Sequence, residues 1–188
     1  MQIVDNSKLT CPQPVINTKK AIEQGLPVKS IVDNDVAKEN VLKLCSKLGL
    51  QTEVIESGGK FEIIISKGGE ELQIKGGDLQ GTYLIKTRYL GYGDDKLGEG
   101  LMKAFIYTLA QREVAPKRIM LVNSGVFLAL KGSQTVEDLK IMEGKGTEIL
   151  SCGTCLDFYN VKEQLAVGTI TNMYDIVENL TDDKTITI

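Results

Sequence analysis

The chain has 188 residues, of which 42% are hydrophobic and 25% charged, and its formal net charge is −3. This composition is ordinary for a folded globular protein, and the absence of a stripe rich in Lys and Arg argues against a surface that binds nucleic acid. No apolar run reaches the roughly 20 residues that cross a bilayer, and the N-terminus lacks a signal-peptide pattern, so we expect a cytoplasmic protein without a membrane partner.

The first segment of the chain alternates strands and helices. The apolar patterns predict strand, helix, strand, helix, strand and strand, at residues 2–5, 12–24, 30–33, 36–48, 53–56 and 61–65. Gly25 and Gly49 are expected to end the two helices, and Ser57-Gly58-Gly59-Lys60 to join the last two strands as a hairpin. Cys45 falls on the apolar face of the second helix, which predicts that this cysteine belongs to the core.

Residues 67–81 differ from the segments on either side of them. They are rich in Gly and in charged residues and show little apolar periodicity, so we predict a linker, with room for one short edge strand at residues 72–74. This linker divides the chain into two predicted domains, residues 1–66 and residues 82–188.

The second predicted domain returns to alternating strands and helices. Strands are predicted at residues 82–86, 118–122, 148–151 and 185–188, and helices at residues 96–112, at residues 135–142 and after Thr171. The residues expected to cap these helices are Asp94, Thr135 (in a capping box with Asp138) and Thr171. This order of elements predicts a mostly parallel sheet with helices on both faces.

The helix predicted at residues 96–112 carries an apolar stripe that we assign to the core. Its members recur at helical spacing and are Leu97, Leu101, Phe105 and Leu109. The preceding Gly91-Tyr92-Gly93 lacks the Gly-Lys-Ser/Thr ending of a phosphate loop. We therefore expect no bound cofactor.

Cys11 opens the sequence Cys11-Pro12-Gln13-Pro14 at the predicted start of the first helix. Proline is tolerated there because the first N–H groups of a helix have no partner within it, so Cys11 should lie at or beside the N-cap. Its sulfur is then expected to face the free N–H groups and the positive end of the helix dipole, which favour the thiolate. The chain contains no histidine to act as a base, and an exposed thiolate without a base suits sulfur transfer rather than hydrolysis. The alternative is a small residue that merely precedes a helix.

Residues 1–66 resemble the TusA/SirA-type sulfur carrier family, whose mark is Cys-Pro-x-Pro at the start of the first helix of a two-layer α/β domain. The matching residues are Asp5, Leu9-Thr10-Cys11-Pro12-Gln13-Pro14-Val15 and Thr18-Lys19-Lys20. The resemblance implies a two-layer α/β sandwich of βαβαββ type, in which Cys11 carries a persulfide and Pro12 and Pro14 support it. Lys8 departs from the family, in which glycine is usual at this position.

A second pair of cysteines follows a predicted strand. Cys152-Gly153-Thr154-Cys155 comes directly after the strand at residues 148–151, and sites in α/β sheets gather at the C-terminal ends of strands. This spacing lets two sulfurs meet across one helical turn as a redox pair. A zinc site needs about four ligands, and without histidine only Cys11 and Cys45 remain to complete one. A third interpretation is two small residues in a tight turn from strand to helix.

Two further groups of polar residues follow strands of the second domain. Asn123 and Ser124 come after the strand at residues 118–122, where they either offer backbone N–H groups to an anion or form a simple turn. Lys86 and Arg88 end the first strand of the domain, where they either lower the pKa of a nearby thiol or form a solvated rim.

Residues 82–188 resemble the DsrE/DsrF-type sulfur-relay fold. The residues that carry this resemblance are Asn123-Ser124-Gly125-Val126, Leu150-Ser151-Cys152-Gly153-Thr154-Cys155-Leu156, Gly168 and Thr171-Asn172-Met173-Tyr174. It implies a mostly parallel, three-layer α/β/α domain in which Cys152 or Cys155 receives sulfur from the carrier cysteine. The two halves together resemble the YedF group of selenium-metabolism proteins.

The sequence therefore predicts a carrier or transfer protein for sulfur or selenium, similar to a sulfurtransferase. Cys11 would hold a persulfide or perselenide, which Cys152 and Cys155 would accept or resolve. The implied partners are a cysteine desulfurase or other sulfur- or selenium-relay proteins, and a second copy of the chain through its C-terminal domain. The alternatives are a thiol-disulfide redox or sensor protein centred on Cys152 and Cys155, and a non-enzymatic module that binds a partner.

Overall fold

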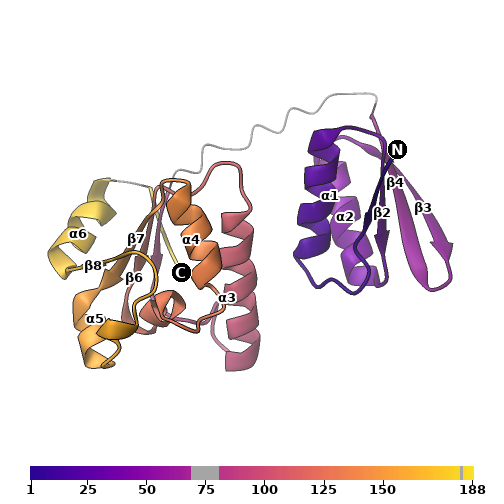
Figure 1. Ribbon diagram of the computed structural model, residues 1–188. Helices are drawn as coiled ribbons and strands as arrows, with labels where there is room; N and C mark the ends of the chain where they lie inside the picture. Colours follow the sequence, from indigo (N-terminus) through magenta and orange to yellow (C-terminus); the bar gives the residue numbers. More distant parts are fainter. Residues whose placement is uncertain (69–80, 183) are drawn as a thin grey trace. The chain divides into compact units, whose positions relative to one another are not determined.

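A computed structural model describes residues 1–68, 81–182 and 184–188 of the chain. The described residues form two compact units, one before and one after residues 69–80 (Figure 1). Most of the linker predicted at residues 67–81, and all of the edge strand predicted at residues 72–74, lie outside the described residues.

The N-terminal unit contains one sheet and two helices. Its elements are β1 (Gln2–Asp5), α1 (Gln13–Gln24), β2 (Val28–Val32), α2 (Asp35–Lys47), β3 (Gln51–Ser57) and β4 (Lys60–Ser66). The strands lie in the order β1-β2-β4-β3, in which β1 and β2 are parallel and the other neighbours are antiparallel. Both helices cover the same face of the sheet (Figure 1). The predicted two-layer βαβαββ sandwich is confirmed.

The core of this unit lies between the sheet and its two helices. Side chains alternate along a strand, so β2 and β4 direct Val28, Val32, Ile63 and Ile65 toward the helices, where all four are fully buried. Cys45 of α2 is also fully buried, as predicted. Burial disfavours the thiolate and raises the pKa of Cys45 to about 11.

The C-terminal unit is built around a parallel sheet. Its elements are β5 (Thr82–Ile85), α3 (Asp95–Ala110), β6 (Arg118–Leu121), the 3-10 helix η1 (Asn123–Ala129), α4 (Val136–Gly144), β7 (Glu148–Cys152), α5 (Gly153–Phe158), the 3-10 helix η2 (Lys162–Gln164), β8 (Thr169–Thr171), α6 (Met173–Asp182) and β9 (Thr185–Thr187). The strand order is β8-β7-β6-β5-β9, and every neighbouring pair of strands described is parallel.

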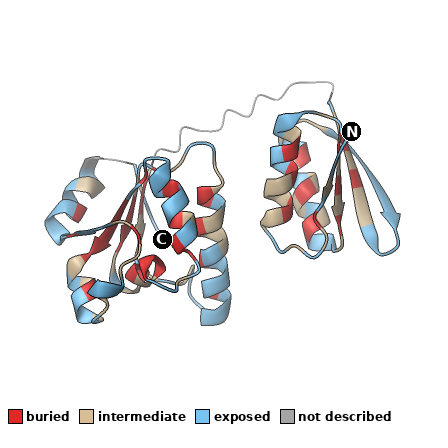
Figure 2. Ribbon diagram, in the orientation of Figure 1, coloured by how far each residue is buried: buried red, intermediate tan, exposed pale blue. Residues whose placement is uncertain are grey.

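Helices cover both faces of this sheet, which confirms the predicted three layers. Alternate residues of β6 serve the two faces: Ile119 and Leu121 pack toward α3 and α4, whereas Met120 packs with Ile176 of α6. Figure 2 shows the buried residues concentrated in the central strands, between the layers of helices. The central strands β5 and β6 are mostly apolar because both of their faces are covered.

The buried face of α3 differs from the predicted stripe. Leu97 and Leu101 are 62% and 44% exposed, whereas Met102 and Ile106 are fully buried. The two rows of apolar side chains lie side by side on the helix, and the position of the sheet selects the second row. Leu109 belongs to the core, as predicted.

Two of the predicted helix caps are wrong. Asp94 caps α3 as expected, since its carboxylate accepts from the N–H of Leu97 at 2.8 Å. Thr135 donates its hydroxyl instead to the carbonyl of Leu128, at 2.6 Å, and makes no side-chain cap for α4. The cap of α6 is Asn172 rather than Thr171, which lies in the short edge strand β8 that the sequence analysis did not predict. Among the described residues, no helix has the length and apolar character that a bilayer crossing requires.

Candidate functional site

Cys11 lies on the loop between β1 and α1, where its side chain is exposed. Pro12 is the N-cap residue of α1, and Pro14 lies in the first turn of the helix. The Cys11–Pro12 peptide bond is cis. The cysteine therefore precedes the helix by two residues, close to where the sequence analysis placed it.

The first N–H groups of α1 do not donate hydrogen bonds to the sulfur of Cys11. The N–H of Gln13 donates to the carbonyl of Thr10 at 3.0 Å, and those of Val15 and Ile16 donate to the carbonyl of Pro12 at 3.1 and 3.2 Å. Because a proline occupies the remaining position of this turn, no free amide is left for the thiol. The expected contact between the sulfur and the opening amides of α1 is therefore wrong.

The donor to Cys11 comes from the neighbouring helix instead. Nδ2 of Asn40, on α2, lies 3.6 Å from Sγ of Cys11 and donates a hydrogen bond to it. Asn40 was not predicted, because no local pattern links residues 29 positions apart. Its contact depends on the packing of α1 against α2.

A buried polar network holds the loop that carries Cys11. Asn6 is fully buried, and its Nδ2 donates to the hydroxyls of Ser30 at 3.0 Å and Thr18 at 3.2 Å. Its Oδ1 accepts from Nδ2 of Asn17 at 3.0 Å. The network ties the end of β1 to α1 and β2, so the start of the loop is fixed on both sides. Buried amides that are satisfied in this way specify one conformation.

Lys8 occupies a backbone conformation that favours glycine. Its φ is 63°, in the left-handed region where a Cβ atom is unfavourable. The N–H of Lys8 donates to the carboxylate of Asp33 at 2.7 Å, and this bond lowers the pKa of Asp33. The glycine usual in the resembling family thus has a geometric reason, and the hydrogen bond to Asp33 helps to hold lysine in the same conformation.

Cys152 and Cys155 occupy the C-terminal end of β7 and the start of α5. Cys152 is only 1% exposed and packs with Met120, Leu150 and Ile176 on the face of the sheet that α6 covers. Cys155 is half-buried, and both cysteines are free thiols. Only Cys155 of this pair is therefore open to a reactant from solvent.

The thiol of Cys155 lies against a backbone N–H group. The N–H of Asn123 donates to its Sγ at 3.1 Å, and Asn123 has a left-handed φ of 50°. The hydroxyl of Tyr159 donates to Oδ1 of Asn123 at 2.7 Å, which fixes this residue. Burial raises the pKa of Cys155 and the Cys152 thiol raises it further, whereas the N–H of Asn123 lowers it. The predicted amide at Asn123 thus meets the thiol, with Tyr159 as a support that was not predicted.

The contacts of the other predicted residues do not include the sulfur of Cys155. Ser124 receives a hydrogen bond from the N–H of Arg88 at 3.4 Å and donates one to Thr87 at 3.4 Å. The guanidinium of Arg88 lies over the ring of Phe127, 5.6 Å from its centroid, rather than on a sulfur atom. Gly153 begins α5 against β8, where an added Cβ would lie 3.1 Å from the side chain of Ile170.

Zinc was one interpretation of the cysteines. In the part of the chain that the structure describes, no group of three or more His, Cys, Asp or Glu side chains is placed to hold a metal ion. Cys45 is enclosed in the N-terminal core. Of the four free thiols, only Cys11 and Cys155 are thus accessible to a reactant.

One family model and several solved structures are similar to parts of this chain. The model of the family described as "Sulfurtransferase TusA" matches residues 2–67. A solved structure of a SirA-like protein from Desulfitobacterium hafniense is 34% identical, with a TM-score of 0.35, over 36% of this chain and 99% of that chain. Comparison with curated proteins finds no match.

Two other solved structures are similar over a longer part of this chain. The ychN protein from E. coli is 16% identical, with a TM-score of 0.46, over 58% of this chain and 99% of that chain. A protein of unknown function from Methanobacterium thermoautotrophicum is 20% identical, with a TM-score of 0.41, over 57% of this chain and 96% of that chain.

Proposed function

Through residues 2–67, this chain belongs to the TusA/SirA-like sulfurtransferase family, and the members of that family are sulfur carriers. We therefore propose that Cys11 carries sulfur as a persulfide. The observation that carries this assignment is the exposure of Cys11 within the matched segment, where Cys45, the other cysteine, is fully buried. Selenium would be carried in the same way, as a perselenide.

The transfer needs a thiolate and a leaving thiolate but no general base. In the loading step the Cys11 thiolate attacks the outer sulfur of a donor persulfide, the sulfur–sulfur bond of the donor breaks, and the donor leaves as a thiolate. Delivery repeats this exchange, with Cys11 as the leaving thiolate. The amide of Asn40 supports both steps, since a donor at Sγ stabilises negative charge on the sulfur.

We assign the C-terminal domain, residues 82–188, to the DsrE/DsrF type, as in the YedF group, and Cys155 to the role of acceptor. Its partial exposure and the N–H of Asn123 support this role. The Cys155 thiolate would attack the outer sulfur of a carrier persulfide and release the carrier thiolate. Attack by Cys152 on the sulfur of Cys155 would then release sulfide and form a disulfide, which a small thiol would reduce.

The donor fits the class of cysteine desulfurases or other sulfur- or selenium-relay proteins. A donor persulfide is attached to a protein, so it must approach a thiol that stands clear of its own domain, as Cys11 does. Association with a second copy of the chain would use the C-terminal domain. These partners complete the proposed relay.

Persulfide loading tests the carrier assignment. The full chain is incubated with a cysteine desulfurase and cysteine, and intact mass spectrometry counts added sulfur atoms before and after reduction. We expect one reducible sulfur on Cys11 in a variant that lacks Cys152 and Cys155, and none after Cys11→Ser. Cys45→Ser is the matched control, because it removes a thiol from the same domain without touching the proposed site. Equal loading of the Cys11→Ser and Cys45→Ser variants would reject the proposal.

A redox pair at Cys152 and Cys155 is a second candidate function. The contact between the two thiols, which contributes to the raised pKa of Cys155, favours it. A reversible Cys152–Cys155 disulfide, formed by mild oxidants with a defined reduction potential, would support this function. Failure to form that disulfide under mild oxidation excludes it and leaves the carrier assignment intact.

A further inference from the structure

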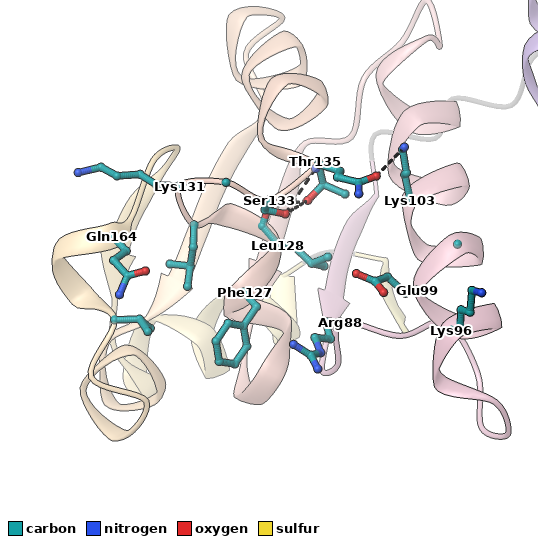
Figure 3. Close-up of a pocket in the computed structure, with 15 residues that line it drawn as sticks. Arg88, Lys96, Glu99, Lys103, Phe127, Leu128, Lys131, Ser133, Thr135 and Gln164 are labelled. Carbon is teal, nitrogen blue, oxygen red and sulfur yellow. Dashed lines mark hydrogen bonds between the residues drawn. The ribbon is translucent and has the colours of Figure 1, made fainter.

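A cavity of about 570 Å³ lies in the C-terminal unit, between α3 and the segment that runs from η1 to α4 (Figure 3). No cysteine lines it, so it is separate from the thiol of Cys155. Its volume lies within the range of small-molecule sites, roughly 300–1,000 Å³. The proposed sulfur transfer leaves this cavity without a role.

The charged residues around the cavity are mostly cationic. They are Arg88, Lys96, Lys103 and Lys131, opposed by Glu99 alone. The chain as a whole has a net charge of −3, so this concentration of positive charge is local. A cleft lined by one sign of charge raises the local concentration of ligands of the opposite sign.

These cations are not paired directly with protein carboxylates, although the carboxylate of Asp138 lies close enough to Lys103 to interact with it electrostatically. Within residues 81–182 and 184–188, none of the four forms an ion pair, in contrast to Lys140 and Lys162 of the same unit. Lys103 donates to the side-chain carbonyl of Gln134 at 2.6 Å, and Lys131 donates to the backbone carbonyl of Glu163 at 3.3 Å. Both acceptors are neutral, so the positive charge remains available to a ligand.

The wall of the cavity near Arg88 carries apolar side chains. The ring of Phe127 is half-buried there, and Leu128 and Val161 continue the surface. The guanidinium of Arg88 donates to the hydroxyl of Tyr89 and lies 4.9 Å from the centroid of that ring and 5.6 Å from the centroid of Phe127, so a planar cation lies beside the Phe127 ring. This combination suits a flat ring that carries an acidic group.

We infer that this cavity binds a small organic anion, a planar or aromatic molecule with a phosphate or carboxylate group. The lysines and Arg88 neutralise the acidic group, and Phe127 and its apolar neighbours receive the ring. The cavity also adjoins the thiol site, because the Phe127 ring packs 4.8 Å from the ring of Tyr159, which supports Asn123. The inference stands without the proposed sulfur transfer, since no cysteine takes part in it.

Phenyl phosphate is a suitable probe, with inorganic phosphate and phenol as its two halves. The full chain is titrated with each compound, and backbone amide shifts and calorimetry report binding. We expect saturable binding of phenyl phosphate, with shifts centred on residues 127–135. Either half should bind at least about tenfold more weakly, because phenol lacks the charge-assisted contacts to the cations and inorganic phosphate lacks the apolar contacts of the ring. If phenol binds as tightly as phenyl phosphate, the cavity does not recognise the acidic group. If inorganic phosphate binds as tightly, the cavity does not recognise the ring. Either result overturns the inference.

Substitution of the cavity lysines separates this site from general attraction to a charged surface. Lys103→Ala and Lys131→Ala should each weaken phenyl phosphate binding about tenfold. Lys140→Ala is the matched control, since Lys140 is an exposed lysine of α4 that pairs with Glu137 and does not line the cavity. Unchanged binding in both cavity variants, or an equal loss in the control, would reject the inference.

Discussion

The thiols of Cys11 and Cys155 lie in contrasting surroundings. Cys11 is exposed on a loop and receives one hydrogen bond, from the side chain of Asn40. Cys155 is half-buried at the end of a parallel sheet and receives its bond from the backbone of Asn123. A thiol on an exposed loop is open to a protein-bound reactant, whereas a half-buried thiol admits a small reactant or requires the surrounding loop to move. The difference in exposure thus predicts that the two thiols react with different partners.

Alkylation of the native chain extends this comparison to the buried thiol of Cys152 and should give the largest effect. Cys11 is expected to react with iodoacetamide at least about a thousandfold faster than Cys152, because a thiol that is 1% exposed reacts only after an opening that costs several kcal/mol. Peptide mass spectrometry over time gives the rate at each cysteine. Cys45 serves as a second buried reference, and comparable rates for Cys11 and Cys152 would break the comparison.

Substitution of Gly125 should disturb only the C-terminal thiol region. An added Cβ would lie 2.4 Å from the backbone oxygen of Ile85, so Gly125→Ala must displace η1 and is expected to lower the free energy of unfolding by about 3 kcal/mol. Gly100→Ala is the control, because nothing lies within 4 Å of its Cβ and a helical alanine should add about 0.5–1 kcal/mol. Denaturant unfolding measures both. A neutral Gly125→Ala would contradict the close approach of η1 to β5.

The N-terminal unit should lose stability in alkaline solution through Cys45. The folded state raises the pKa of this thiol to about 11, so the protonated form is favoured by folding. The corresponding stability is complete below the pKa of the unfolded thiol and is lost as the pH rises toward about 11, with a magnitude of about 3 kcal/mol. Thermal unfolding at increasing pH measures this loss, which Cys45→Ala should remove. The same pH dependence in the variant would exclude Cys45 as its source.

Removal of the Tyr159 hydroxyl should produce the smallest effect and sharpen the description of Cys155. Without its hydrogen bond Asn123 is less firmly held, so its N–H stabilises the Cys155 thiolate less well. We expect Tyr159→Phe to slow alkylation of Cys155 about fivefold at constant pH, and to leave Cys11 unchanged. Tyr174→Phe is the control because that ring is 74% exposed. An equal rate in the wild-type chain and Tyr159→Phe would remove Tyr159 from the site.

Local sequence patterns predicted most helices and strands and the burial of the Cys45 thiol. The helix that contains Cys45 has periodic apolar residues, and the central strand β6 lies in an apolar run; both patterns indicate which side chains are buried. Only part of the α3 face that enters the core was predicted: Leu109 is buried and Phe105 packs against the core, but Met102 and Ile106 were missed because Leu97 and Leu101 are equally apolar. Which of two adjacent rows of apolar side chains on α3 is buried depends on where the sheet lies against the helix.

The sequence by itself determined the order of most strands and helices, the burial of Cys45 and the placement of Cys11 just before α1. These features follow from residue types at short spacings, which act through the local backbone. Only the tertiary structure decided that Asn40 rather than an α1 amide meets Cys11, and that Tyr159 supports the amide at Cys155. Such partners lie about 30 residues apart along the chain, and a hydrogen bond between them exists only after the helices have packed.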